Sequence, residues 1–460
     1  MVEIGEGEEK LKEGAPRFSS PSPNLSTRLA PSPLHFKGFR VYRIPVADFP
    51  EIRKKDMRLE AESPPYPAQA GAGTAFGIPS GRHSDPGCSR AFYSPYPQSN
   101  ATRMIDILNL TFPELERFIV EDLGQPKFRA AQVWQWIWQK HATSFDAMTD
   151  VSKQLRAKLA EVAEIVLPEI VTVQTSSDGT EKLLLRLRDG ALVETVILPS
   201  TGQDGSVRIA QCVSSQIGCA MGCTFCSTGT MGFIRNMTAG EILSQVLVAR
   251  MRLGDNRIDH PIIRNLVFMG MGEPLLNLRE TTRALEMLNH DKGMDFSPRR
   301  ITVSTCGIKA GLRELGDSGL AFLAVSLHAP NQDLRAKIMP KAANWHLDDL
   351  MATLESYPLK TREHITFEYL LLGGVNDQPE HARELAKLVS RVKGKLNLIA
   401  YNPSETQLYK APTEADILAF EKILWSKGVT AILRKSKGQD IKAACGQLKS
   451  DWEREKGDGE

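Results

Sequence analysis

The feature that most constrains the fold is an alternation of short apolar runs with amphipathic helical segments after Gly205. Six runs have the length and apolar character of buried strands. They are VRIAQCVSS, NLVFMG, RRITVSTC, LAFLAVSLHA, ITFEYLLL and KLNLIAYN. Strands that alternate with helices predict a parallel sheet, because each helix returns the chain to the same end of the sheet. We therefore expect an α/β fold in which residues 206–449 form an incomplete TIM-like barrel of six β/α units.

The functional site of such a fold is expected at the carboxyl ends of the strands, where the loops that follow them meet. A cysteine-rich loop follows the first predicted strand. GMGEP follows the second, STCG the third, SLHAP the fourth and YNPSE the sixth. We expect these five loops to lie together.

Residues 1–103 differ in composition from the rest of the chain. They hold 14 of the 27 prolines and show no sustained hydrophobic period. That composition predicts a disordered extension, because it provides too little apolar surface for a packed core. An equally acceptable interpretation is that the true start is Met104. Residues 450–460 are interpreted as a charged tail.

Residues 104–165 predict a small helical accessory domain. The segment TFPELERFIVEDLG begins with a Thr and a Pro and ends with a Gly, which are helix-terminus signals. The next helical segment carries an apolar stripe of Phe128, Val133, Ile137 and Trp138. We interpret the tryptophans as packing residues, with stacking on nucleic acid as the alternative. These tryptophans are Trp134, Trp136 and Trp138.

Residues 166–205 predict a β-hairpin that links the helical domain to the barrel. The stretch TEKLLLRLRDGALVETVILPS alternates apolar and polar residues on both sides of Asp189-Gly190. An Asp-Gly pair between two such runs is a strong hairpin signal.

Composition excludes several classes of protein. No apolar run approaches the roughly 18 residues that a membrane helix needs, and the acidic start resembles no secretory or transit peptide. We therefore expect a cytoplasmic protein. Seven cysteines, unevenly clustered in 460 residues, do not suit a disulfide framework. A net charge of +2 gives no global signature of nucleic-acid binding, so any RNA site must be a local patch.

The cysteine loop shows the spacing C-x3-C-x2-C, formed by Cys219, Cys223 and Cys226. A structural zinc site usually has a second ligand pair, and none is suitably placed nearby. Three thiolates on a four-iron cluster would leave one iron open to chelate a substrate such as S-adenosylmethionine. An iron–sulfur cluster is the favoured interpretation, and a zinc-stabilised RNA-binding module is the alternative.

Several motifs together resemble the RlmN/Cfr family of radical S-adenosylmethionine RNA adenosine methyltransferases. They are CVSSQIGCAMGCTFCSTGTMGFIRNMTAGEI, FMGMGEPLLNL, RRITVSTCGI, AVSLHAP and RKSKGQDIKAACGQL. The resemblance runs from about Met104 to Lys449, and MGFIRNMT is closer to the RlmN branch. It implies the radical-SAM type of partial barrel, a [4Fe-4S] cluster and S-adenosylmethionine as cofactors, and an electron donor such as flavodoxin or ferredoxin.

The resemblance gives the cysteines different roles. Cys219, Cys223 and Cys226 match the cluster ligands. Cys445 matches the cysteine that is methylated and carries the one-carbon unit, whereas Cys212 matches the thiol that resolves the covalent RNA adduct and leaves a Cys212–Cys445 disulfide. Glu194 matches the acceptor of the ring proton. Cys306 is given no role.

The resemblance also implies the contacts to S-adenosylmethionine. A glycine permits close backbone approach, and a carboxylate suits the ammonium of the ligand. The matching positions are Gly272, Glu273, Ser304, Ser326, Leu327, His328 and Asn402.

The substrates implied are 23S rRNA, methylated at C2 of an adenosine with two S-adenosylmethionine molecules per turnover, and the anticodon loop of some tRNAs. The target base must leave its stack to reach Cys445. Arg299, Arg300 and the stretch LRKSKGQD at 433–440 are candidate phosphate contacts, with a solvated charged face as the equal alternative for each. A Cfr-type enzyme of the same mechanism, which methylates C8 and gives antibiotic resistance, is the second interpretation.

Overall fold

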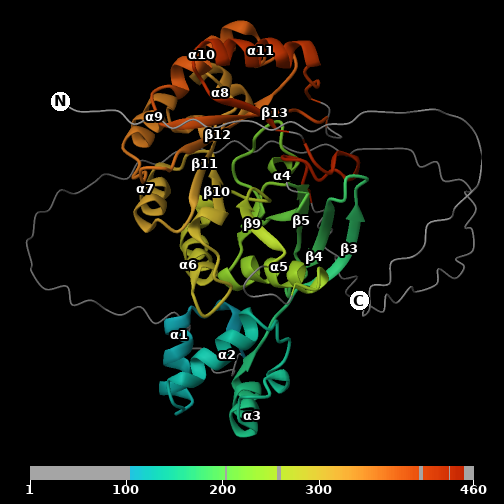
Figure 1. The fold of residues 1–460 in the computed structure, drawn as a ribbon, viewed down its shortest axis with the longest axis vertical. Coiled ribbons are helices and arrows are strands. Elements are labelled where there is room, and N and C mark those ends of the chain that lie inside the picture. Colours follow the sequence, from blue (N-terminus) through green and yellow to red (C-terminus); the bar gives the residue numbers. More distant parts are fainter. Residues whose placement is uncertain (1–103, 203–204, 256–260, 404–407, 435, 450–460) are drawn as a thin grey trace, which may run out of the picture. The chain divides into compact units, whose positions relative to one another are not determined.

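The structure is a computed structural model that describes residues 104–202, 205–255, 261–403, 408–434 and 436–449 (Figure 1). The predicted extension at 1–103 and the predicted tail at 450–460 lie outside the described residues. No helix within the described part of the chain is both long and apolar enough to cross a membrane.

Residues 105–164 form the predicted helical segment. Its elements are β1 (Ile105–Asp106), α1 (Phe112–Arg117), α2 (Phe128–Trp138), α3 (Lys153–Val162) and β2 (Ala163–Glu164). Strands β1 and β2 pair in parallel and bring the two ends of the segment together. Thr111 and Glu114 form a capping box before α1, as the Thr-Pro start predicts. Arg283 donates to the Glu114 carboxylate at 2.7 Å and so ties this segment to the larger sheet domain.

The interpretation of the tryptophans as packing residues is confirmed for Trp134 and Trp138, which are buried and meet edge-to-face. The ring of Trp136 is partly exposed and lies under the Lys140 ammonium, 3.8 Å from the ring centroid. The expected stripe is wrong at its first member, because Phe128 is exposed. Phe128 is the first residue of α2, and its ring contacts the Arg129 guanidinium instead of the core.

Most strands of the described chain belong to one ten-stranded sheet. One end of the sheet is antiparallel and contains β3 (Glu169–Thr175), β4 (Glu181–Arg186) and β5 (Leu192–Thr201). The predicted hairpin at Asp189-Gly190 joins β4 to β5, and the Leu187 N–H donates to the Ala191 carbonyl at 2.8 Å. Because β5 also pairs with β6, these strands extend the sheet.

The other strands of this sheet run parallel, as predicted. In sheet order they are β6 (Val207–Cys212), β9 (Ile263–Phe268), β10 (Ile301–Thr305), β11 (Phe322–Ser326), β12 (Ile365–Leu371), β13 (Gly394–Ala400) and β14 (Ala431–Arg434). All six predicted strands are present, and β14 is a further parallel strand that the sequence interpretation missed.

Helices connect the parallel strands and cover the sheet (Figure 1). They are α5 (Ala239–Arg252), α6 (Leu278–Asn289), α7 (Lys309–Ser318), α8 (Gln332–Ile338), α9 (Leu347–Glu355), α10 (Pro379–Val389) and α11 (Glu414–Ser426). The core lies between these helices and the strands, where Tyr369 of β12 stacks on Phe420 of α11. The α/β class and the barrel-like order of β/α units are therefore confirmed, with more strands than expected.

Candidate active site

The cysteine loop is shaped by a small hairpin. Strands β7 (Gln216–Gly218) and β8 (Phe233–Asn236) pair antiparallel and enclose the loop and the short helix α4 (Ser227–Thr230). Gly218 has a φ of +70°, and a Cβ there would lie 2.0 Å from the Gly232 carbonyl oxygen. That same oxygen accepts the Cys219 N–H at 2.8 Å. Only glycine at position 218 allows this closure.

Cys219, Cys223 and Cys226 line one cavity of about 150 Å³ at the carboxyl ends of the strands. The predicted residues that share its wall are Gly272, Glu273, Ser304, Ser326, His328 and Cys445. The expectation that the strand-end loops meet is thus fulfilled for four of them in this cavity. YNPSE lies only partly within the described residues, and Asn402 does not line the cavity.

Glu273 is fixed by the backbone around it. One carboxylate oxygen accepts the Leu275 N–H at 3.1 Å and the other accepts the Cys306 N–H at 2.8 Å. Burial raises the pKa of this carboxyl, and these hydrogen bonds oppose the shift. Gly272 has a φ of +96°, and a Cβ there would meet Gln216 at 2.5 Å. The GMGE turn can therefore approach the cysteine loop only with glycine at position 272.

The loops after β10 and β11 contribute hydroxyl groups and a neutral imidazole. Ser304 and Ser326 lie with their Oγ atoms 3.3 Å apart. His328 adopts a φ of +54°, and its Nδ1 accepts the Leu370 N–H at 3.0 Å. Burial lowers the pKa of His328 to about 3, so the ring is uncharged at neutral pH. Leu327 is fully buried behind this wall.

Cys445 reaches the cavity because the C-terminal segment, residues 436–449, folds back over the sheet. The Ser227 N–H donates to the Gly446 carbonyl at 2.7 Å, and the Thr228 hydroxyl donates to the Leu448 carbonyl at 2.5 Å. The Lys449 N–H donates to Glu194 at 2.8 Å. Figure 1 shows this segment, in red, beside α4 and the ends of β4 and β5.

Cys212 is buried at the end of β6 and does not line the cavity itself. Burial and the nearby Cys445 raise the pKa of the Cys212 thiol to about 12, and the Arg434 guanidinium opposes this. The surrounding protein likewise raises the pKa of Cys445, although its surface remains exposed, and Arg434 again opposes the shift. The two thiols therefore share one basic neighbour. Both are free in this structure.

Glu194 lies on β5 and is also outside the cavity wall. Its side chain forms a buried ion pair with Lys182 of β4, with Nζ 3.0 Å from Oε1. The sequence around Lys182 does not indicate that its ammonium is buried.

Three more residues of this region were missed by the sequence interpretation. Cys306 lines the cavity although it was given no role. Arg335 is fully buried on α8 and donates to the carbonyls of Cys306 and Leu327 at 2.6 and 2.8 Å. Glu368 of β12 lines the cavity with one carboxylate oxygen that has no hydrogen-bond partner among the described residues.

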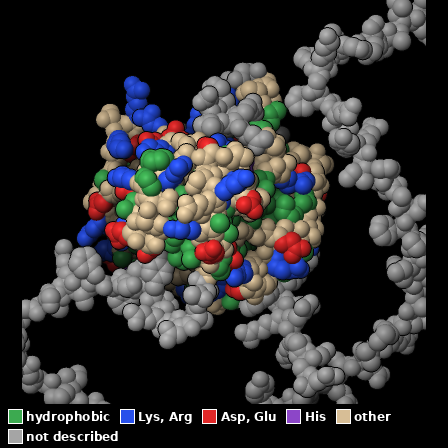
Figure 2. Space-filling model, turned by 90° about the horizontal axis from the view of Figure 1, so that it is seen from below, with side chains coloured by type: hydrophobic (Ala, Val, Ile, Leu, Met, Phe, Trp, Pro, Cys, Tyr) green, Lys and Arg blue, Asp and Glu red, His purple; other side chains and the backbone are tan. Residues whose placement is uncertain are grey.

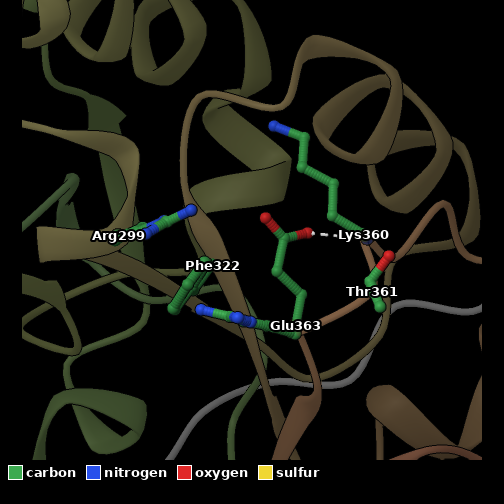
Figure 3. A pocket seen from close by; sticks show the side chains of 6 residues that line it. Arg299, Phe322, Lys360, Thr361 and Glu363 are labelled. Atoms are coloured by element: carbon green, nitrogen blue, oxygen red, sulfur yellow. Dashed lines mark hydrogen bonds between the residues drawn. The ribbon is translucent and has the colours of Figure 1, made fainter.

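A second pocket, of about 420 Å³, lies at the opposite ends of the strands (Figure 3). Arg299 precedes β10, Phe322 begins β11, and Lys360 to Glu363 precede β12. The Lys360 N–H donates to Glu363 at 3.0 Å. The predicted phosphate contact Arg299 is thus separated from the cysteine cavity by the length of β10. On the face drawn in Figure 2, basic side chains are interspersed with acidic ones.

The residues of the cavity fit a cluster with three thiolate ligands. Three cysteines from one loop face a shared space beside a free carboxylate oxygen and two hydroxyls. Among the described residues, no three His, Cys, Asp or Glu side chains are arranged to hold a single metal ion. Zinc would need thiolates about 4 Å apart, since Zn–S bonds are about 2.3 Å. The arrangement therefore suits a cluster better than a zinc ion.

Comparison with known proteins agrees with this geometry. Residues 213–386 match the radical SAM superfamily, and residues 105–165 match the N-terminal domain of a ribosomal RNA large subunit methyltransferase. A radical SAM methyltransferase from Sphaerobacter thermophilus superposes with a TM-score of 0.69 at 41% identity, covering 75% of this chain and 99% of that one. The fold and the cysteine cavity are thus those of a radical S-adenosylmethionine enzyme, a class that uses a [4Fe-4S] cluster.

The particular family follows from the relatives. The dual-specificity RNA methyltransferase RlmN of Nitratidesulfovibrio vulgaris (strain DP4) is 73% identical over 347 residues, which are 75% of this chain and 95% of that protein. The RlmN of Lawsonia intracellularis is 64% identical over 349 residues, 76% of this chain and 98% of that protein. The chain belongs to the RlmN family of radical S-adenosylmethionine RNA methyltransferases. The Cfr-type interpretation is not favoured by these relatives.

Proposed function

We propose that this enzyme methylates C2 of a specific adenosine in 23S rRNA and of an adenosine in the anticodon loop of some tRNAs. The observation that carries the proposal is the meeting of Cys445 with Cys219, Cys223 and Cys226 around one cavity, although more than two hundred residues separate them in sequence. A carbon such as adenine C2 is a poor nucleophile and does not accept a methyl group by direct polar transfer. A protein-bound one-carbon carrier beside a radical-generating site provides an alternative route.

The cofactor sites are proposed on the same cavity. Cys219, Cys223 and Cys226 would hold the cluster, which supplies the electron for reductive cleavage of S-adenosylmethionine when both are bound. Glu273 and Gly272 would face the amino group of S-adenosylmethionine, with Ser304, Ser326, Leu327, His328 and Asn402 as further contacts. The hydroxyls of Ser304 and Ser326 and the carboxylate of Glu273 are suitable acceptors for its polar groups.

The thiols divide the work on the one-carbon unit. Cys445 would accept a methyl group by displacement at the sulfonium of S-adenosylmethionine. Once a hydrogen atom has been removed from that methyl group, its carbon would bond to the adenine ring. Glu194 accepts the proton that leaves the ring. The Cys212 thiolate attacks the sulfur of Cys445, so that a disulfide forms and the carbon leaves with the RNA. The guanidinium of Arg434 near both thiols supports this exchange, since the thiolate is the reacting form.

The partners and location are part of the proposal. An electron donor such as flavodoxin or ferredoxin would reduce the cluster, and the enzyme would act in the cytoplasm without a membrane partner. The helical segment at 104–165 would contact RNA, and the hairpin region at 166–205 would support the C-terminal segment. The exposed Lys140–Trp136 contact offers a cation and an aromatic face for such binding.

Nucleoside analysis tests the proposal most directly. The anaerobically reconstituted enzyme would be incubated with a 23S rRNA fragment, a tRNA, S-adenosylmethionine and a reductant, and the digested RNA analysed by mass spectrometry. We expect 2-methyladenosine from both RNAs. 8-Methyladenosine would establish the Cfr-type reaction instead, and absence of any methyladenosine from a cluster-loaded enzyme would refute the proposal.

A further inference from the structure

Lys182 is a buried ammonium that the proposed chemistry does not use. Its Nζ lies 3.0 Å from Oε1 of Glu194 on the neighbouring strand, and the two side chains are 10% and 5% exposed. Of the ion pairs between described residues, only Arg250–Asp255 is buried as deeply. A buried ion pair rarely adds net stability, because desolvation of both charges offsets their attraction. Its place in the fold therefore suggests another purpose.

The pair contacts the C-terminal segment on both sides of Cys445. Lys182 Nζ lies 3.4 Å from the Lys442 carbonyl oxygen, to which it donates, and the Lys449 N–H donates to Glu194 Oε2 at 2.8 Å. Lys442 has a φ of +53°, a left-handed conformation that costs a non-glycine residue about 1–2 kcal/mol. The hydrogen bond from Lys182 thus stabilises the backbone at Lys442, where the conformation is unfavourable.

The segment is also held by contacts with other described residues. Gly446 and Leu448 are held through their carbonyls by Ser227 and Thr228 of α4. The Gly438 N–H donates to Asp178 at 3.1 Å, seven residues before Cys445. The Glu194 carboxylate contacts the Lys182 ammonium from β4 and the Lys449 N–H. The backbone of Glu194 is held separately, because its carbonyl accepts the Ser214 hydroxyl and its N–H donates to the Met271 sulfur. Among these, Lys182 carries the charge that matches an ionised Glu194.

We propose that Lys182 is a positioning residue that, through its ion pair with Glu194, locks the segment carrying Cys445 against the sheet, and that this lock opens when Glu194 accepts a proton. The inference rests on the proposed role of Glu194 as proton acceptor. An ionised carboxylate accepts charge-assisted hydrogen bonds from both Lys182 and Lys449, and these are about twice as strong as neutral ones. Once a proton moves from the adenine ring to a Glu194 oxygen, both bonds weaken. Loss of the ring proton would then be linked to release of the segment.

Hydrogen exchange of the full-length protein, without RNA or S-adenosylmethionine, tests the lock. The peptide that spans residues 436–449 would be followed by mass spectrometry. We expect at least tenfold faster exchange in Lys182→Met, because the buried Glu194 charge then loses the Lys182 ammonium. We expect a similar increase in Glu194→Gln, which imitates the neutral acid. Lys182→Arg keeps the charge and should remain closer to the original protein.

A control and a double variant separate the pair from general damage. Arg186 lies on the same strand and forms an exposed ion pair with Glu169 at 2.8 Å, so Arg186→Met should leave the exchange unchanged. If Lys182 and Glu194 act through their pair, the double variant Lys182→Met with Glu194→Gln should exchange no faster than the faster single variant. The double variant removes both charges of the pair, so it can still be measured if Lys182→Met fails to fold.

Either of two results would overturn the inference. One is exchange in Lys182→Met or Glu194→Gln within twofold of the original protein. The other is a double variant whose acceleration equals the product of the two single effects, which would mean that the residues act independently. Because the assay needs neither substrate nor methylation, its failure is distinguishable from failure of the proposed function. The latter would appear as missing methyladenosine in a protein whose segment is locked as expected.

Discussion

The closure of the cysteine loop on Gly218 leads to a prediction that separates steric from conformational effects. In Gly218→Ala, the new Cβ would lie 2.0 Å from the Gly232 carbonyl oxygen, about 1 Å inside the shortest contact that real Cβ atoms make. That oxygen also accepts the Cys219 N–H. The strands must therefore separate and the hydrogen bond must break, which places Cys219, the first proposed cluster ligand, out of position.

The magnitude follows from two contributions. A left-handed alanine costs about 1–2 kcal/mol, and loss of a buried hydrogen bond adds about 1 kcal/mol. Gly222 is the matched control, since it lies in the same loop with a φ of +59° and an added Cβ would have nothing within 4 Å. Gly222→Ala should therefore lose only about 1–2 kcal/mol, without displacement of a cysteine.

The assay is iron content per chain after anaerobic reconstitution, together with visible absorption and urea denaturation of the apoprotein. Gly218→Ala should load well under half of the iron that Gly222→Ala loads. Its free energy of unfolding should also be lower than that of Gly222→Ala, by roughly 1 kcal/mol or more. Equal iron loading in the two variants would show that the close approach at Gly218 does not shape the cluster site.

Three further predictions concern other parts of the chain. Cys212→Ala should accumulate RNA covalently attached to Cys445, visible as a shifted band on a denaturing gel, whereas Cys445→Ala should form no such adduct. If Cys212→Ala shows no shifted band while deoxyadenosine is still produced, the proposed division of roles is wrong. Deletion of residues 1–103 should leave cluster content and methylation intact. Burial raises the pKa of Glu114, but hydrogen bonds from Arg283 and Thr111 outweigh it and lower the pKa to about 2. The stabilisation from this ion pair is present above the unfolded pKa near 4.5 and is lost as pH falls towards 2. Arg283→Met should therefore destabilise the protein by about 1–2 kcal/mol at pH 7 and by much less at pH 3, as measured by denaturant unfolding.

The parallel strands could be predicted because their apolar runs are buried on both faces. β14 could not, since Ile432 and Leu433 are exposed and the basic residues that follow resemble a surface loop. Its strand character comes from pairing with β13, through the register of Leu396 with Ala431. β3 was missed for a similar reason, because most of its side chains are exposed at the edge of the sheet.

The part of the candidate site that depends on the spacing of residues in sequence could be predicted. The part that depends on how distant segments pack together could not. The interval between Cys219, Cys223 and Cys226 indicates a cluster loop by itself. The pairing of Lys182 with Glu194 depends on how β4 and β5 align, and each residue alone resembles an ordinary surface charge. Tertiary packing also decides that Glu368 keeps a free oxygen on the cavity wall.

The dependence of the cavity on residues 436–449 has a consequence for biosynthesis. A ribosome adds these residues only after every strand of the sheet has been made, so the loops after β6, β9, β10 and β11 can assemble on the nascent chain before Cys445 exists. The protein would therefore pass through an intermediate in which the three-cysteine loop is folded and the proposed methyl carrier, Cys445, is absent. Until translation reaches Cys445, such a chain would have the proposed cluster ligands and would lack the thiol proposed to transfer carbon to RNA.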